Sequence, residues 1–528
     1  MERWARGWLL CGLLLVAGVL LAGPAAAAPP PDPATDVIGW ENGYWYNESI
    51  EVDQGDGLSE AERMAYVNRT AARVEVLRGL EFSAPVPVTV VPRDEYRNQT
   101  AGNASDAYRA WNNQVWEALF VVGEDEDVED VLHSTASSAT TGAYVYTTDE
   151  IQIVTDSPDQ PAIDRGTLAH ELVHALHDQH YNLSAPRFQG HTQDEQLAIL
   201  GLVEGDANYV EANYQERCWT DWECVGTPST ISGGSGGGDV NRGVLFTLYQ
   251  PYSDGTPYVH SLVESGGWAA VNEAFERPPS ATEQVIHVTN EEPVPLSVED
   301  EATAGWRTFP DEGVNGTDTT GEASMFAMLW YQASEHNADT INPAVIQQNI
   351  GEYDEFNYDA PPTAGWGNDA VLPYQRYTVT GPEYGYVWVT EWESDRDARE
   401  FERAYHAILD AHDARPVGPQ TWVIESGSPA NPEPFADAFR VVRDGRTLTI
   451  VNGPEIDDLD DIRPSLPGQL EEPGTPTQEP PPGSPMEPEA TPTEDGSLTE
   501  APPQAGFGPL AAAAGLVGWL LFRRRRRP

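Results

Sequence analysis

The sequence predicts an α+β protein in which a helical body is followed by a small α+β unit. Long segments such as residues 59–80 and 194–217 show the apolar spacing of helices. Short runs rich in β-formers, at 85–92 and 143–154, are typical of strands. Residues 384–453 then combine a strand, a helix and a hairpin with an Asp-Gly turn.

Composition indicates a folded but very acidic protein. The chain has 528 residues, a formal net charge of −56 and no lysine, with 40% hydrophobic residues and 16 Trp. Acids are spread along the whole chain, and salt would screen their repulsion. In this it resembles proteins of extreme halophiles, which predicts a fold that depends on salt. An acidic calcium-binding surface is the alternative, although no D-x-[DN]-x-[DN]-G loop occurs; nucleic acid is excluded as a partner.

Residues 1–28 have the pattern of a secretory signal peptide. Arg3 and Arg6 precede an apolar run over 8–21, and small residues end near Ala28. Cys11 lies inside that run and is removed with it. Export is therefore expected.

The mature chain keeps two cysteines, Cys218 and Cys224. Outside the cell such a pair predicts a local disulfide, and a zinc site built on two cysteines is the weaker interpretation. Sequons fit a surface glycoprotein; they begin at Asn47, Asn68, Asn98, Asn103, Asn182 and Asn315.

The C-terminal end predicts attachment to a membrane. Residues 457–505 are rich in Pro, Glu, Thr and Ser and should form an extended acidic stalk. Residues 506–528 hold an apolar run and five arginines, as in a spanning segment with its stop signal. Stalk and tail together resemble the PGF-CTERM sorting tails of haloarchaeal surface proteins, although Ala505 stands where that pattern has Pro. The resemblance implies a protein on the outer face of the membrane, held there by this segment or by a lipid anchor.

Between signal and stalk we expect three parts: residues 29–160, 161–300 and 301–456. The first contains a helix at 59–80 that begins at Ser59, a strand at 85–92, a helix at 106–120, an acidic loop at 123–130 and two β runs at 143–154. The second contains a histidine-rich helix with Asp164 as its N-cap, the helix at 194–217 and a Gly-rich break at 232–239. The third closes with the strand, helix and hairpin of 384–453.

The histidine-rich helix carries the clearest chemical motif, H-E-x-x-H. His170 and His174 lie one turn apart on the same face, where both imidazoles can bind one metal ion. Glu171 lies beside them, placed to take a proton from an attacking water. His177 and His180 follow, and we interpret them as solvated or supporting residues.

A catalytic zinc site needs a third protein ligand, and Glu204 on the second helix is the candidate. Gly201, Gly205 and Ala207 are short, so we expect them to let this helix approach the histidine helix. The surrounding run LAILGLV is apolar, and an unpaired acid there would be costly.

The HELVHALHDQHYNL segment followed by LVEGDANY resembles the gluzincin class of zinc metallopeptidases. The resemblance spans roughly residues 60–455 and implies a zincin-like fold, Zn²⁺ held by His170, His174 and Glu204, Glu171 as general base and a peptide substrate. Many gluzincins also have an Asp four residues after the third ligand; Asn208 stands at that position here.

The remaining roles stay open. His287 is our first candidate to stabilise the oxyanion, ahead of Tyr258, His260 and Tyr209. A non-catalytic surface protein with a structural or vestigial metal site is the alternative function, and hydrolysis of a non-peptide ester or amide is a third.

Overall fold

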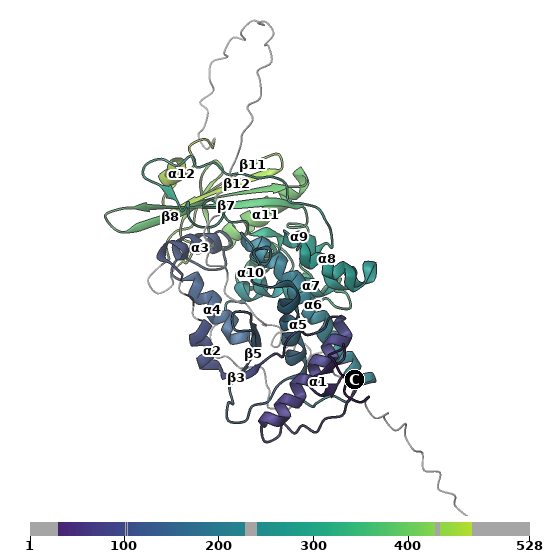
Figure 1. Ribbon diagram of the computed structural model, residues 1–528. Helices are drawn as coiled ribbons and strands as arrows, with labels where there is room; N and C mark the ends of the chain where they lie inside the picture. The colour runs from purple at the N-terminus through teal and green to yellow at the C-terminus, as the bar shows by residue number, and fades with distance from the viewer. Residues whose placement is uncertain (1–29, 101, 103, 228–239, 428–432, 467–528) are drawn as a thin grey trace, which may run out of the picture.

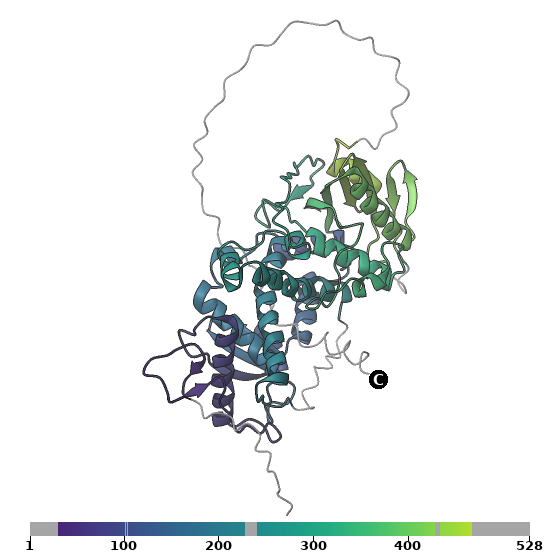
Figure 2. The ribbon, with the colours of Figure 1, turned by 90° about the vertical axis from the view of Figure 1, so that its right-hand side faces the viewer.

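The computed structural model describes residues 30–100, 102, 104–227, 240–427 and 433–466, and shows a mixed α+β protein (Figures 1 and 2). This confirms the predicted class. The segments predicted as signal peptide (1–28), Gly-rich break (232–239) and tail (506–528), and the part of the predicted stalk beyond residue 466, lie outside the described residues. Within the described part of the chain, no helix is both long and apolar enough to cross a membrane.

A three-stranded sheet supports the histidine-rich helix. Its order is β3 (Val88–Pro92), β5 (Glu150–Thr155) and β4 (Gly142–Val145), with β3 parallel and β4 antiparallel to β5. The two β runs predicted at 143–154 are thus confirmed as a hairpin. Ile151 and Ile153 pack with Leu168 and Leu172 of the helix above them, so the sheet fixes one side of that helix.

A seven-stranded antiparallel sheet forms the C-terminal part and lies at one end of the helical body (Figure 1). Its order is β6 (Arg307–Thr308), β7 (Trp366–Tyr377), β8 (Pro382–Trp392), β12 (Thr447–Gly453), β11 (Ala438–Asp444), β10 (Thr421–Val423) and β9 (Arg415–Gly418). The predicted strand and Asp-Gly hairpin are confirmed as β8 and β11–β12. The sheet is larger than the sequence predicts, because β6, β7, β9 and β10 were not expected.

Side chains along β8 point alternately to the two faces of this sheet, and both faces are buried. Tyr386 and Trp388 point toward α11 (Asp395–Ala411), whereas Val387 packs with Leu459 and Ile462 of α12 (Ile456–Ile462). Residues 457–462, placed by the sequence in the stalk, therefore form part of the folded body. The apolar side chains at Leu459 and Ile462 explain the difference, since they complete the outer face of the sheet.

The other helices form the body below the large sheet. They are α1 (Glu60–Arg78), α2 (Arg93–Thr100), α3 (Asp106–Ala118), α4 (Val128–Ala139), α5 (Arg165–Tyr181), α6 (Gln193–Thr220), α7 (Arg242–Gly266), α8 (Trp268–Glu276), α9 (Thr282–Ile286) and α10 (Gly321–Glu335). Two 3₁₀ turns, at Pro186–Phe188 and Pro343–Gln347, and a short pair of strands, β1 (Trp40–Glu41) and β2 (Tyr44–Trp45), complete it.

Local signals explain several helix starts. Helix α1 begins after Ser59, as the sequence predicts, and Ser59 caps it in a capping box with Glu62. The end of the acidic loop differs from the prediction, because Asp127 caps α4 and residues 128–130 are helical. The predicted disulfide is present and joins Cys218, in the last turn of α6, to Cys224 just after the helix.

A buried cluster of acids joins α6 to the large sheet. Asp194, in the first turn of α6, accepts hydrogen bonds from the backbone and hydroxyl of Thr282 at 3.0 and 2.5 Å. Asp318 accepts one from the backbone of Gln193 at 2.9 Å, and Asp369 of β7 accepts one from Gly321 at 2.9 Å. These bonds hold the start of α6, which carries the predicted third ligand.

The same acids predict that stability falls as pH rises. Burial raises the pKa of Asp194 to about 7 and that of Asp318 to about 8, whereas unfolded Asp titrates near 3.9. Between about pH 4 and 8 the folded chain therefore binds more protons, and raising the pH favours unfolding. At constant salt and with a chelator present, the melting temperature should be higher at pH 5 than at pH 8.

Neutral variants test that pH dependence. Asp194→Asn should flatten the pH profile, because asparagine keeps the acceptor oxygen but does not ionise. The exposed Asp56 gives a matched control, and Asp56→Asn should leave the profile unchanged. A wild-type melting temperature that rises from pH 5 to pH 8 would contradict the assignment.

Candidate metal centre

Helix α5 presents the H-E-x-x-H motif on its buried face. Asp164 begins the helix and accepts hydrogen bonds from Gly166 and Thr167, as predicted. His170, Glu171 and His174 are 2%, 0% and 4% exposed. Polar side chains buried to this extent need partners.

Helix α6 supplies such a partner in Glu204, which is 3% exposed. Glu204 Oε2 lies 3.1 Å from His170 Nε2 and 3.2 Å from His174 Nε2, and the two Nε2 atoms are 3.0 Å apart. The three residues chosen from the sequence as metal ligands therefore meet at one point.

The spacing of these donor atoms fits a zinc ion. Ligands about 2.0 to 2.1 Å from a tetrahedral zinc stand about 3.3 Å from each other. The three observed separations are close to that value, and the two-nitrogen, one-oxygen set suits zinc. Burial raises the pKa of Glu204, but the charge of His174 and the hydrogen bonds to both histidines outweigh it and hold this pKa at about 2. The Glu204 carboxylate is thus ionised.

Glu171 lies beside the three ligand residues with one oxygen engaged and one free. Its Oε2 accepts a hydrogen bond of 2.8 Å from the backbone N–H of Tyr144 in strand β4. Its Oε1 is buried and has no hydrogen-bond partner among the described residues. Burial raises the pKa of this carboxyl, whereas the charges of His170 and His174 lower it. Gly142 leaves room here, since a Cβ would lie 3.1 Å from Glu171 Oε1.

Residues behind the ligands differ from those that the sequence singled out. Glu211 Oε2 lies 3.5 Å from His170 Nδ1, which makes no hydrogen bond among the described residues. Glu211 is therefore the acid placed beside that ring, where a supporting residue would stand. Asn208, the expected position, instead donates to the backbone of Tyr252 at 3.2 Å. Glu211 is two helical turns after Glu204 and lies on the same face, a spacing that could have identified it.

His177 and Asp206 form a separate buried pair. His177 Nε2 lies 2.8 Å from Asp206 Oδ2, which also accepts a 2.7 Å hydrogen bond from Arg78. The His177 ring packs edge-on to His174, with ring centroids 5.9 Å apart. His177 is therefore a supporting residue. His180 is exposed and lies 2.8 Å from the backbone oxygen of Glu81.

The glycines of α6 do not pack against α5, as the sequence predicted, but against other helices. Neither Gly201 nor Gly205 faces α5. A Cβ on Gly205 would lie 2.2 Å from the Gly255 carbonyl oxygen of α7, and a Cβ on Gly201 would lie 3.0 Å from the Val285 side chain of α9. Ala207 is the residue that packs in the core shared with α5. The reason is geometric, since neighbouring residues of a helix point about 100° apart. Gly205 therefore cannot share the face of Glu204.

This contact predicts a large effect of a single methyl group. Gly205→Ala should destabilise the fold by about 1 to 3 kcal/mol or more, because backbone meets backbone and neither helix can yield locally. Chemical denaturation at constant salt measures the loss. Gly226→Ala is the control, because a Cβ there would have nothing within 4 Å. Equal stability of both variants would contradict this packing.

The four candidates for an oxyanion donor make other contacts. His287 Nε2 lies 2.9 Å from Glu322 Oε2, and none of its hydrogen bonds or ion pairs within the described ranges involves the ligand residues. His260 and Tyr209 pack against each other with ring centroids 5.6 Å apart, and Tyr258 is buried in the α6–α7 core. Tyr252, which no motif singled out, stacks on His170 with ring centroids 6.4 Å apart.

Two surface depressions lie away from this centre. One, of about 590 Å³, is lined by residues such as Asp127 and Asn241, and the other, of about 360 Å³, by residues such as Glu283, Trp366 and Arg446. None of the ligand residues lines either of them.

Comparisons with known proteins concern the C-terminal part. A model of a domain of unknown function, DUF8575, matches residues 307–463, the segment that contains the seven-stranded sheet. No curated protein matches the chain. No solved structure matches it either. The chain is thus similar, over its C-terminal sheet, to the DUF8575 domain.

Proposed function

We propose that the chain is an exported zinc-dependent hydrolase of the gluzincin type, with a zincin-like body and a peptide as substrate. The observation that carries the proposal is the meeting of His170, His174 and Glu204 beside Glu171, whose Oε1 has no hydrogen-bond partner among the described residues. A buried carboxylate oxygen without a partner is costly unless another group uses it.

Each residue then has a defined task. His170, His174 and Glu204 hold the ion, which when bound polarises a scissile carbonyl and makes water more acidic. Glu171 accepts a proton from the attacking water at Oε1 and delivers it to the leaving amine. The Tyr144 N–H fixes Oε2 and so keeps Oε1 directed at the reacting water.

Strand β4 supports a peptide as the substrate. It forms an edge of the three-stranded sheet, and within the described part of the chain no further strand pairs with it. An extended peptide can add to such an edge through backbone hydrogen bonds. Because Tyr144 of this strand contacts Glu171, a bound peptide would run past the proposed base. His287 stays our candidate for the oxyanion, with Tyr252 as its competitor.

Location and attachment belong to the same proposal. The signal peptide at 1–28 and the PGF-CTERM-like tail at 506–528 favour a halophilic protein on the outer face of the cell membrane. The Cys218–Cys224 disulfide supports an oxidising compartment.

One observation favours a second function, a structural metal site. His170, Glu171, His174 and Glu204 are all at most 4% exposed, and structural zinc sites are closed whereas catalytic ones keep an open position. In that case the ion would only tie α5 to α6. The free oxygen of Glu171 argues for catalysis, because a structural site has no use for a base.

A peptide-library digest separates these functions. Full-length protein in molar salt, loaded with zinc, should release fragments detectable by mass spectrometry. Removal of zinc with a chelator should stop cleavage, and added zinc should restore it. A zinc-loaded, folded protein that cleaves no peptide would leave the structural site as the better account.

A further inference from the structure

The smaller of the two surface depressions, of about 360 Å³, lies where the helical body meets the large sheet (Figure 1). Glu283 of α9 lines it from the body. Trp366 at the start of β7, Trp392 at the end of β8 and Arg446 in the β11–β12 turn line it from the sheet. We call this depression the junction pocket. A volume of this order is enough for a small ligand, and the wall combines residues inside and outside the DUF8575 match.

Hydrogen bonds fix the wall between α9 and the sheet. The Gln284 side chain donates to the carbonyl of Glu291 at 2.8 Å. Val294 N–H donates to the carbonyl of Gly367 at 2.9 Å, and Asn368 Nδ2 donates to the carbonyl of Val294 at 2.6 Å. Gly367 lies at the register shift in the β7–β8 pairing, and strand irregularities of this kind are common beside functional sites. The segment that follows α9 is therefore bonded to both sides of the pocket.

Glu283 is a buried acid in this wall. It is 7% exposed, and its carboxylate makes no hydrogen bond or ion pair with any described residue. Burial, and next the charge of Glu322, raise the pKa of this carboxyl to about 8, although the charge of His287 lowers it. The charges of Glu393 and Glu291, which also line the pocket, act on it too, so the carboxylate faces the pocket. A buried carboxylate without a partner is costly unless a ligand supplies one.

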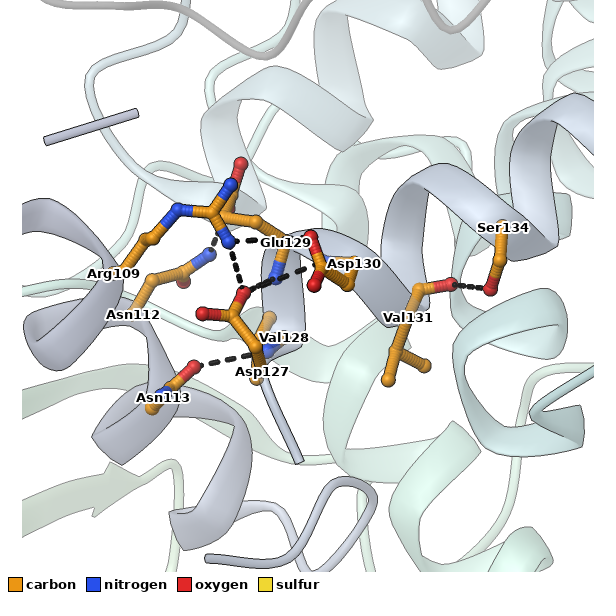
Figure 3. Close-up of polar contacts among 9 residues, drawn as sticks. All are labelled: Arg109, Asn112, Asn113, Asp127, Val128, Glu129, Asp130, Val131 and Ser134. Atoms are coloured by element: carbon orange, nitrogen blue, oxygen red, sulfur yellow. Dashed lines mark hydrogen bonds and ion pairs between the residues drawn. The ribbon is translucent and has the colours of Figure 1, made fainter. Parts of the chain in front are cut away.

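The larger depression differs, because its acids already have partners. Figure 3 shows Arg109 beside Asp127 and Asp130, and Arg109 Nη1 lies 3.3 Å from the Asp130 carboxylate. In the same view the Ser134 hydroxyl donates to the carbonyl of Val131 at 3.0 Å. None of the residues that line this depression is buried. It therefore offers no group that requires a ligand.

The charges of the junction pocket favour a cation as its ligand. Four glutamates line the pocket: Glu283, Glu291, Glu292 and Glu393. Arg446 is the basic residue of the lining, and its Nη2 lies 3.2 Å from Glu391, which is outside the lining. The charge of that arginine is thus offset from behind. A positive ligand would meet net negative charge in the pocket.

A single metal ion does not fit this arrangement. In the described part of the chain, two groups of acids and histidines bring three ligand atoms within 4.8 Å of one another, and neither group includes a residue of the junction pocket. Carboxylates spread around a pocket suit a larger, organic cation. Trp366 and Trp392 donate their indole N–H groups to Asp369 and Thr390, which leaves ring carbons for the pocket. Guanidinium groups bind well beside such rings.

We propose that the junction pocket binds a guanidinium group, carried by a small guanidino compound or by an arginine side chain, with Glu283 as its carboxylate partner. A guanidinium is planar, always charged and less strongly hydrated than an ammonium, so it can enter a buried site. It can form two parallel hydrogen bonds with one carboxylate. Binding gives Glu283 the partner that it does not have among the described residues.

Titration of the full-length protein in molar KCl at pH 8, followed by ligand-detected NMR, tests the proposal. The probe is N-acetyl-arginine amide, whose charge is on the guanidinium alone. Its citrulline analogue is the control, because it has nearly the same shape and no charge. The arginine probe should bind and raise the melting temperature, and the citrulline analogue at equal concentration should do neither. The lysine analogue should bind several-fold more weakly than the arginine probe, because an ammonium is more strongly hydrated.

Three variants with the same chemical change locate the site. Glu283→Gln keeps the shape of the side chain but removes the charge, and should weaken binding of the arginine probe roughly tenfold or more. Glu393→Gln, at an exposed position of the lining, should weaken binding less and leave the melting temperature without ligand unchanged. Glu216→Gln, exposed on α6 and outside the lining, should bind like the wild type.

Agmatine and a capped Gly-Gly-Arg-Gly-Gly peptide distinguish the two sources of the guanidinium. Tighter binding of agmatine would identify a small compound and tighter binding of the peptide an arginine side chain, and either order supports the site. Binding of the citrulline or lysine analogue as tight as that of the arginine probe would overturn the proposal, as would unchanged affinity in Glu283→Gln. The readout is binding and not hydrolysis, so it is independent of the proposed function.

Discussion

Replacing Glu171 with glutamine is expected to lower peptide hydrolysis by roughly two to four orders of magnitude while zinc stays bound. Glutamine has the same shape, and its carbonyl oxygen can still accept the hydrogen bond from Tyr144 N–H. It cannot take a proton from water at neutral pH. Initial rates on a peptide identified by the library digest, together with metal content, measure both effects.

A matched control separates loss of the base from loss of charge. Glu216 is exposed on α6, so Glu216→Gln makes the same chemical change away from the site. It should keep wild-type rates. If Glu171→Gln turned over as fast as Glu216→Gln, Glu171 would not be the base and the proposed mechanism would fail.

Replacing Glu204 should lower zinc affinity sharply, because it removes one of the three proposed ligands. Glu204→Gln keeps the volume of the side chain but loses the charge that faces both Nε2 atoms. Zinc affinity, measured by competition with a coloured chelator, should fall by at least about tenfold to a hundredfold, as for loss of a ligand or its support.

His177 lies one turn after His174 on the same helix, and the structure makes a distinct prediction for it. Its Nε2 faces Asp206 at 2.8 Å, so it is not free to replace Glu204. His177→Gln should therefore lower zinc affinity much less than Glu204→Gln. The opposite order would mean that His177, not Glu204, holds the ion.

The histidine-rich helix α5 was predictable because its signals are local. Asp164 marks its start, and the four-residue spacing of His170 and His174 alone puts both rings on one face. The choice of Glu204 rested on its apolar surroundings, and the structure places it at the two rings. The informative observation was a single acid, Glu204, within an apolar stretch of sequence that was expected to be buried.

Contacts between helices were harder to predict than the helices themselves. Gly201 and Gly205 indicate a close approach, but a glycine spacing does not say which neighbours approach; here they are α7 and α9. Helix α7 itself was not expected, since Pro251 and Pro257 lie inside it and each removes a backbone hydrogen bond. Its burial against α6 offsets that loss.

The remaining differences depend on long-range packing. Residues 457–462 are acidic and resemble the stalk that follows, yet Leu459 and Ile462 fill the face of a sheet whose strands lie elsewhere in the sequence. The supporting position of Glu211 behind His170 similarly depends on how α6 crosses α5. Such features cannot be predicted until the three-dimensional arrangement of the helices and strands is known.

The central claim is that His170, His174 and Glu204 hold a zinc ion, and metal content by mass spectrometry tests it most directly. The chain, purified in molar salt without added metal, is compared with Glu204→Ala. We predict close to one zinc per chain in the wild type and a clear loss in the variant. A folded wild-type protein without zinc, or equal zinc in both, would contradict the account and leave the histidine cluster as a buried polar contact between two helices.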